Sequence, residues 1–335
     1  MALLEVKDLS VVLQTQRGPA RAVRDVSFTL ERGQTLGLVG ESGCGKSITA
    51  MSLMGLLPEH SRVTGSIRFE GRELVGLPER QLCDLRGDRI GMIFQEPMTA
   101  LNPVHSIGRQ VAEPLRLHRG MSASAARKEA IALLDRVGIP DAARRIDAYP
   151  HQFSGGQRQR ITIAMALACG PDLLIADEPT TALDVTIQQQ ILDLIRELVA
   201  ERGMAMILIS HDLGVVAQNV SRMLVMYGGS VVESGATADV FANPSHPYTL
   251  GLFGARPRLG GARGARLVTI PGTVPELADL PGGCPFAGRC AWTRPECHVT
   301  VPPPHEVGPG QHARCIRLDA VAADKAAAAD QEAVA

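Results

Sequence analysis

The eight residues GESGCGKS, from Gly40 to Ser47, constrain this chain most, because they match the pattern G-x-x-x-x-G-K-[ST] of a phosphate-binding loop. The glycines let backbone N–H groups turn toward an anion, Lys46 would reach the β- and γ-phosphates, and the Ser47 hydroxyl would ligate Mg²⁺. A Gly-rich turn without a ligand is the alternative. The loop lies between a predicted buried strand, TLGLVG, and a predicted helix, KSITAMSLMGLL, whose N-terminus would face the phosphates. This setting favours a nucleotide site.

A second buried strand, DLLIAD, ends in the carboxylates Asp177 and Glu178. Asp177 is expected to support Mg²⁺ behind its direct ligands, and Glu178 could polarise an attacking water. An Asp-Glu pair after a strand is otherwise usually a solvated strand end. Beside a phosphate loop, the catalytic interpretation is favoured.

Strands and helices alternate along the chain, which predicts an α/β fold with a mainly parallel sheet covered by helices. Further strands are expected at 4–14, 22–30 and 204–210, a helical region at 106–138, and a helix at 185–203 that ends at Gly203. After Phe241 proline and glycine become dense, so a domain boundary is expected near 242–258. The Ala-rich segment 321–335 is expected to be a frayed helix or disordered.

The stretch FSGGQRQR, from Phe153 to Arg160, predicts a second anion site. Ser154 can cap the following helix, and Gly155 and Gly156 leave bare N–H groups at its start. Two such sites cannot easily serve one phosphate within one subunit. The sequence therefore predicts a head-to-tail pair in which each SGGQ segment closes on the γ-phosphate of the other chain.

Five motifs occur in order: the phosphate loop, SGGQ, LLIADEP, TALD (residues 181–184) and the histidine His211. Over residues 3–240 the chain therefore resembles the ATP-binding cassette (ABC) family. The resemblance implies a RecA-like core, an antiparallel β subdomain and a helical subdomain, with a small Cys-rich C-terminal extension here. It implies ATP and Mg²⁺ as ligands.

The resemblance also implies roles for single residues. Glu178 would be the catalytic base, His211 would contact the γ-phosphate, Gln95 would touch Mg²⁺ and sense the membrane partner, and Asp184 would act across the dimer. Mg²⁺ would be held by Ser47, Gln95 and Asp177. The expected ATP-binding residues are Leu13, Gly40, Glu41, Ser42, Gly43, Cys44, Gly45, Lys46, Ser47 and Gln95, and the signature residues acting on the other subunit are Ser154, Gly155, Gly156 and Gln157.

One position departs from the family pattern. Family members usually stack adenine on an aromatic side chain near the first strand, and by alignment of LSVVLQT this position is Leu13. Apolar contact would then replace stacking.

Among ABC proteins, the sequence favours a separate ATPase subunit that docks on membrane permeases. No stretch is long enough to span a bilayer, there is one phosphate loop, and the net charge of −1 gives no sign of nucleic-acid binding. The stretches FQEPMTALNP, NPSHPYTLGLFGARPRL and IPGTVPELADLPGGCPFAGRC resemble the ATPase subunits of dipeptide and oligopeptide importers. Nickel importers share much of this pattern. A nucleic-acid ATPase with a cysteine metal module is the rival class, but it predicts a basic face and paired C-x-x-C ligands.

This resemblance implies the partners and the location. The partners would be a second, distinct ATPase subunit, two transmembrane permeases and, indirectly, a substrate-binding protein. The chain would lie on the cytoplasmic face of the cell membrane as a peripheral subunit. The expected division is 1–245 for the nucleotide-binding domain, 246–320 for the importer-type extension and 321–335 for the tail.

Four cysteines in the extension, Cys284, Cys290, Cys297 and Cys315, follow the spacing C-x₅-C-x₆-C-x₁₇-C. Four thiolates suit either tetrahedral zinc or a [4Fe–4S] cluster. The wide gaps favour the cluster over zinc, and the resemblance points the same way, since some peptide-importer ATPases carry such a cluster here. Free or oxidised cysteines without a metal are the third alternative.

Overall fold

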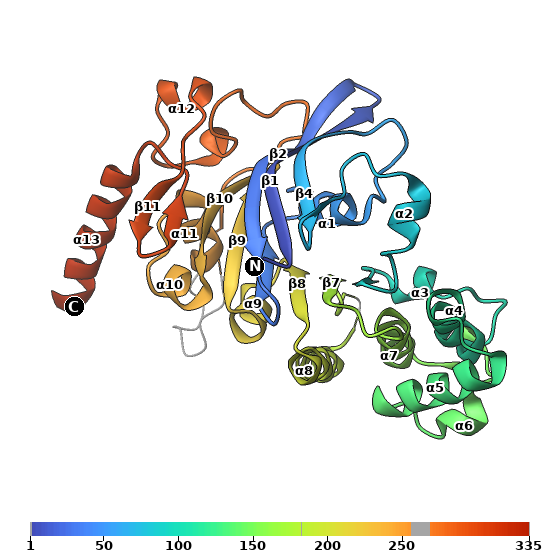
Figure 1. Ribbon diagram of the computed structural model, residues 1–335. Helices are drawn as coiled ribbons and strands as arrows, with labels where there is room; N and C mark the ends of the chain where they lie inside the picture. Colours follow the sequence, from blue (N-terminus) through green and yellow to red (C-terminus); the bar gives the residue numbers. More distant parts are fainter. Residues whose placement is uncertain (1, 182, 256–268, 335) are drawn as a thin grey trace.

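The computed structural model describes residues 2–181, 183–255 and 269–334 and contains two β-sheets with helices around them (Figure 1). The smaller sheet is antiparallel, with the order β2-β1-β4-β5. Along β1, Leu4 and Val6 are buried whereas Glu5 and Lys7 are exposed, the period of two of a strand with one covered face. The predicted N-terminal strands are confirmed. The strands of this sheet are β1 (Leu4–Thr15), β2 (Gly18–Leu30), β4 (Arg62–Phe69) and β5 (Arg72–Glu73).

The larger sheet has the order β11-β12-β10-β9-β3-β8-β7-β6. Neighbours from β9 to β6 pair in parallel, and the pairs from β9 to β11 are antiparallel. The central strands β7 and β8 are buried throughout, as expected for apolar strands covered by helices on both faces. The mainly parallel sheet is thus confirmed. Its strands are β3 (Thr35–Val39), β6 (Ile90–Ile93), β7 (Leu173–Asp177), β8 (Ala205–Ser210), β9 (Arg222–Tyr227), β10 (Ser230–Ala236), β11 (His305–Gly308) and β12 (Gln311–Ala313).

The helical region predicted at 106–138 forms two helices, α4 and α5, which begin after the capping residues Ser106 and Ser122. Together with α3, α6 and α7 they lie at the lower right of Figure 1, away from the C-terminal part. Helix α8 ends where it was predicted to, at Gly203, which has a left-handed backbone. The helices of the first 245 residues are α1 (Lys46–Met54), α2 (Glu79–Cys83), α3 (Pro97–Ala100), α4 (Ile107–Arg119), α5 (Ala123–Arg136), α6 (Ala142–Arg145), the 3₁₀ helix η1 (Pro150–Gln152), α7 (Gly155–Ala166), α8 (Val185–Arg202), α9 (Leu213–Asn219) and α10 (Thr237–Ala242).

The C-terminal part continues the larger sheet, because β12 pairs with β10. The segment 321–335, predicted to be a frayed helix or disordered, lies in helix α13 as far as residue 334, and a hydrogen bond from Trp292 Nε1 to Asp324 Oδ2 joins this helix to the rest of the extension. Of the boundary region predicted at 242–258, residues 256–258 lie outside the described residues. No helix in the described ranges is both long and apolar enough to cross a membrane. The remaining helices are α11 (Pro247–Gly254), η2 (Ala287–Arg289), α12 (Pro295–Val299) and α13 (Leu318–Val334).

Candidate nucleotide-binding site

The phosphate loop connects β3 to α1, as predicted. Gly45 has φ 93°, and a Cβ there would lie 2.5 Å from the carbonyl oxygen of Ala22, so only glycine fits this position. Lys46 is 5% exposed, and its Nζ donates to the carbonyl oxygens of Gly40 (2.8 Å) and Glu41 (2.9 Å). Burial lowers the pKa of Lys46, and nearby groups, Asp177 among them, oppose this shift. The loop therefore holds the buried amine of Lys46 against two of its own backbone carbonyl groups.

The predicted magnesium residues Ser47 and Asp177 meet in the structure. Ser47 Oγ donates to Asp177 Oδ1 at 3.1 Å. Asp177 ends β7 and is 5% exposed, and burial raises its pKa. A hydroxyl and a carboxylate are the hard oxygen ligands that Mg²⁺ prefers, so this pair fits the ion that the sequence implies.

Two predicted catalytic residues, Gln95 and His211, approach one carboxylate oxygen of a third, Oε2 of Glu178. Gln95 Nε2 donates to it at 3.3 Å, and His211 Nδ1 lies 3.2 Å from it. Thr181, which the sequence did not single out, donates its hydroxyl to the same oxygen at 3.0 Å. Gln95, Glu178 and His211 follow the adjacent parallel strands β6, β7 and β8, whose carboxyl ends meet at one edge of the sheet.

The backbone of Glu178 has φ 45°, a left-handed conformation that is costly for a residue with a side chain. Its N–H nevertheless donates to the carbonyl oxygen of Ile209 at 3.0 Å, which ties it to β8. The sheet thus holds the carboxylate in a strained, fixed position, and such strain is typical of functional sites.

The SGGQ segment and Asp184 serve as helix caps within the chain. Ser154 Oγ accepts from the N–H of Gln157, and Gln157 Oε1 accepts from the N–H of Ser154, a capping box at the start of α7. Asp184 Oδ1 accepts from the N–H of Ile187 at the start of α8. The roles of Ser154, Gly155, Gly156, Gln157 and Asp184 toward a second subunit stay predictions.

Beside the phosphate loop lies an open pocket of about 590 Å³ that sequence reasoning missed. Ser42 and Gly43 of the loop form one wall, and the turn between β1 and β2 forms another. The third wall comes from the C-terminal part, where Glu276 and Asp279 bind Arg17 at 2.8 and 2.7 Å. Leu13 is partly buried against the core and does not line this pocket, so its contact with adenine stays a prediction. The lining residues are Thr15, Gln16, Arg17, Ser42, Gly43, Val274, Pro275, Glu276, Leu277 and Ala278.

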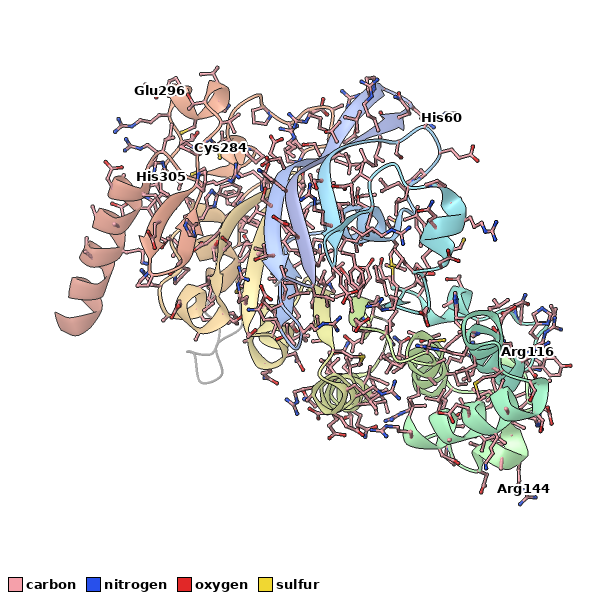
Figure 2. All side chains as sticks on the ribbon, viewed as in Figure 1. His60, Arg116, Arg144, Cys284, Glu296 and His305 are labelled. Carbon is pink, nitrogen blue, oxygen red and sulfur yellow. The ribbon has the colours of Figure 1, made fainter. Side chains whose placement is uncertain are left out.

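The four cysteines of the extension line a common pocket, together with His246 and Phe286. Cys284 lies within the C-terminal part of the molecule (Figure 2). Burial raises the pKa of Cys284 to about 12 and that of Cys290 to about 11, which favours neutral thiols. Within the described ranges, no group of three or more His, Cys, Asp or Glu side chains is placed to hold a metal ion. The predicted iron–sulfur cluster and the alternative zinc ion, with Cys284, Cys290, Cys297 and Cys315 as ligands, are thus not supported by this structure.

Comparison with known proteins places this geometry in a family. Residues 23–181 match the ABC transporter family, and residues 232–297 match the C-terminal region of oligopeptide/dipeptide transporters. The oligopeptide transport ATP-binding protein OppD of Salmonella typhimurium is 53% identical, and OppD of Escherichia coli is 52% identical, each over 94% of this chain and 93% of the relative. The fold matches the dimeric ATP-binding cassette MJ0796 in its post-hydrolysis state with ADP and phosphate, with a TM-score of 0.63, 28% identity and coverage of 70% of this chain and 98% of that one. The chain therefore belongs to the family of ATP-binding subunits of dipeptide and oligopeptide ABC importers.

Proposed function

We propose that this chain hydrolyses ATP as the energising subunit of a membrane ABC importer that takes up di- or oligopeptides. The observation that carries the proposal is the meeting of Gln95, Glu178 and His211 at the edge of the sheet that also presents the phosphate loop. Relatives at 52–53% identity carry the names of oligopeptide transport ATP-binding proteins.

The residues of the site have separate roles in the binding and hydrolysis of ATP. The backbone N–H groups of residues 40–45 and the amine of Lys46 bind the phosphates. Ser47 and Gln95 would hold Mg²⁺, and the Asp177 carboxylate accepts a hydrogen bond from the Ser47 hydroxyl at 3.1 Å. Mg²⁺, when bound, offsets the charge on the phosphate oxygens. Glu178 takes a proton from the water that attacks the γ-phosphorus, while the bond from this phosphorus to the bridging oxygen breaks and ADP leaves. His211 reaches the γ-phosphate from the end of β8.

The position of the signature segment at the start of α7 supports a two-subunit assembly. The bare N–H groups of Gly155 and Gly156 act on ATP bound by a second, distinct ATPase subunit, so that two subunits enclose two nucleotides. Closure of this pair moves two transmembrane permease subunits on the cytoplasmic face of the membrane. A substrate-binding protein delivers the cargo, and this chain does not touch it.

Co-purification from membranes tests the assembly and the cargo class. The tagged full chain should bring down two permeases and a second ATPase subunit, and ATP hydrolysis by the complex in vesicles should increase when peptide-loaded binding protein is added. If a nickel-loaded binding protein stimulates ATP hydrolysis instead, the cargo is nickel. Recovery of nucleic acid in place of permeases would refute the proposal.

We also propose, from the spacing of the four cysteines and their shared pocket rather than from any ligating geometry, that this part of the extension holds a [4Fe–4S] cluster with a structural role. In support, Cys284, Cys290, Cys297 and Cys315 line a common pocket, and Cys284, Cys297 and Cys315 are buried there. Four thiolates without carboxylate or paired histidine ligands are the donor set of such clusters.

Anaerobic purification followed by metal analysis and visible absorption tests this assignment. The cluster predicts a brown protein with iron and acid-labile sulfide, and Cys290→Ser should bleach it and lower its melting temperature. A colourless protein with one zinc per chain would instead assign zinc, and a protein without metal would leave the pocket as four thiols.

A further inference from the structure

Arg289 of the C-terminal extension binds the phosphate loop directly. Its Nη1 lies 2.7 Å from Oε2 of Glu41 and its Nη2 lies 3.2 Å from Oε1, a two-pronged contact across 248 positions of sequence. The Arg289 side chain is only 6% exposed. Glu41 is the second residue of the loop, between Gly40 and Ser42. The extension therefore reaches one of the residues that would surround the nucleotide phosphates.

The guanidinium of Arg289 is held in a single orientation. Its Nε donates to the carbonyl oxygen of Pro271 at 2.8 Å, and Nη2 also donates to that of Gly272 at 3.3 Å. Nη1 also donates to the hydroxyl of Tyr227 at 3.2 Å. All five N–H donors of the side chain are thus paired. Burial alone would lower the pKa of Arg289, but the bonds to Glu41 and Tyr227 outweigh it and raise this pKa.

A second contact fixes the backbone of the same loop residue. The N–H of Glu41 donates to the hydroxyl oxygen of Tyr248 in α11 at 2.8 Å. The ring of Tyr248 packs on those of Tyr227 and Phe286, with centroids 4.7 and 5.3 Å away. Phe286 lies three residues before Arg289. The C-terminal part thus supports Glu41 at both its backbone and its side chain.

The charge of Glu41 is placed where it would oppose nucleotide binding. Its carboxylate acts electrostatically on Lys46, the amine that would meet the phosphates. The carbonyl oxygen of Glu41 also accepts from Lys46 Nζ. A bare carboxylate at this point would repel the triphosphate anion. The guanidinium of Arg289 neutralises it and holds it on the side of the extension.

We propose that Arg289 is a positioning residue of the phosphate loop, which neutralises Glu41 and makes nucleotide affinity depend on the docked C-terminal extension. This rests on the proposed binding of ATP at the loop.

The test measures binding of AMP-PNP with Mg²⁺ to the purified full chain by calorimetry. Arg289→Met should raise the Kd about tenfold or more, because the carboxylate of Glu41 loses its charged partner beside the phosphate site. Arg289→Lys keeps the charge but not the two-pronged guanidinium contact, so its Kd should lie between those of Arg289→Met and the wild type. Glu41→Gln should lower the Kd, because it removes the opposing charge and leaves that of Arg289. The double variant Glu41→Gln with Arg289→Met should bind clearly more tightly than Arg289→Met alone.

Lys325→Met is the matched control, because Lys325 joins α13 to Asn243 and Pro244 away from the loop. It should leave the Kd within about twofold of wild type. Folding is checked by melting temperature and by the fluorescence of Trp292, the single tryptophan of the chain, which lies in the extension.

The outcomes separate the two proposals. A wild-type chain that does not bind AMP-PNP would refute the proposed function. Wild-type binding together with an unchanged Kd in folded Arg289→Met would refute the positioning role. If Arg289→Met does not fold, Glu41→Gln decides: a lower Kd supports the charge argument, and an unchanged or raised Kd overturns it.

Discussion

Replacing Glu178 by glutamine isolates the chemistry of the carboxylate from its place in the structure. Gln95, Thr181 and His211 all approach the same oxygen, Oε2. A glutamine can place its carbonyl oxygen there and its NH₂ group at the position of Oε1, so the contacts of Oε2 survive. The charge and the proton-accepting capacity are what is lost.

The expected loss is set by the contribution of a positioned general base, about 100- to 10,000-fold in rate. This corresponds to about 2.7 to 5.5 kcal/mol of barrier. Steady-state ATP hydrolysis by the assembled complex measures the rate, and AMP-PNP titration shows whether the site still binds. Thr181→Val, which removes one hydrogen bond but keeps the base, is the control and should cost less than about tenfold. Turnover of Glu178→Gln within a few fold of wild type would refute the assignment of the base.

Three further tests address the backbone conformation and the burial of single residues. Glu178→Gly should be about 1 kcal/mol more stable in urea unfolding than Glu178→Ala, because φ 45° strains any residue with a Cβ, and equal stability would contradict this. Gly45→Ala should abolish AMP-PNP binding, since its Cβ would lie 2.5 Å from a carbonyl oxygen, whereas Gly43→Ala, with no atom within 4 Å, should be milder in the same titration. Burial raises the pKa of Glu233 above its ordinary 4.5, so the folded chain favours the protonated carboxyl. The stabilisation that Glu233 gives the folded chain therefore falls as pH rises through that raised pKa. The glutamine of Glu233→Gln does not titrate. The amount by which the variant is less stable than the wild type, measured as unfolding free energy, should therefore shrink between pH 5 and pH 7.5. A difference that grows over this range would show the opposite pKa shift.

Local patterns predicted the elements that position the site. The runs TLGLVG and LLIAD are apolar because their strands are covered on both faces, and Gly203 ends α8 because a left-handed residue is needed there. The roles of Gln95 and His211 came from resemblance, since no local pattern says that residues after β6 and β8 meet a carboxylate after β7.

Contacts between distant segments could not be predicted. Arg17 meets Asp279 across 262 positions of sequence, and Arg289 meets Glu41 across 248. Single charged residues in loops carry no periodic signal that would pair them.

The Ala-rich tail was ambiguous for a different reason. Alanine has the highest helix propensity, yet an isolated helix of this length is marginal in water. The bond from Trp292 to Asp324 supplies the tertiary contact that favours the helix α13.

The continuous larger sheet has a consequence for shortening this protein. Backbone hydrogen bonds run from β7, which ends at Asp177, through β8, β3, β9 and β10 to β12 near the C-terminus. A chain cut after residue 245 would leave β10 as an open edge strand, a template for pairing with other chains. The buried carboxylate of Glu233 would also lose its bond from Gln311, 2.8 Å long in the intact protein. A minimal cassette of this protein is therefore expected to aggregate unless the β11–β12 hairpin is kept to cover that edge.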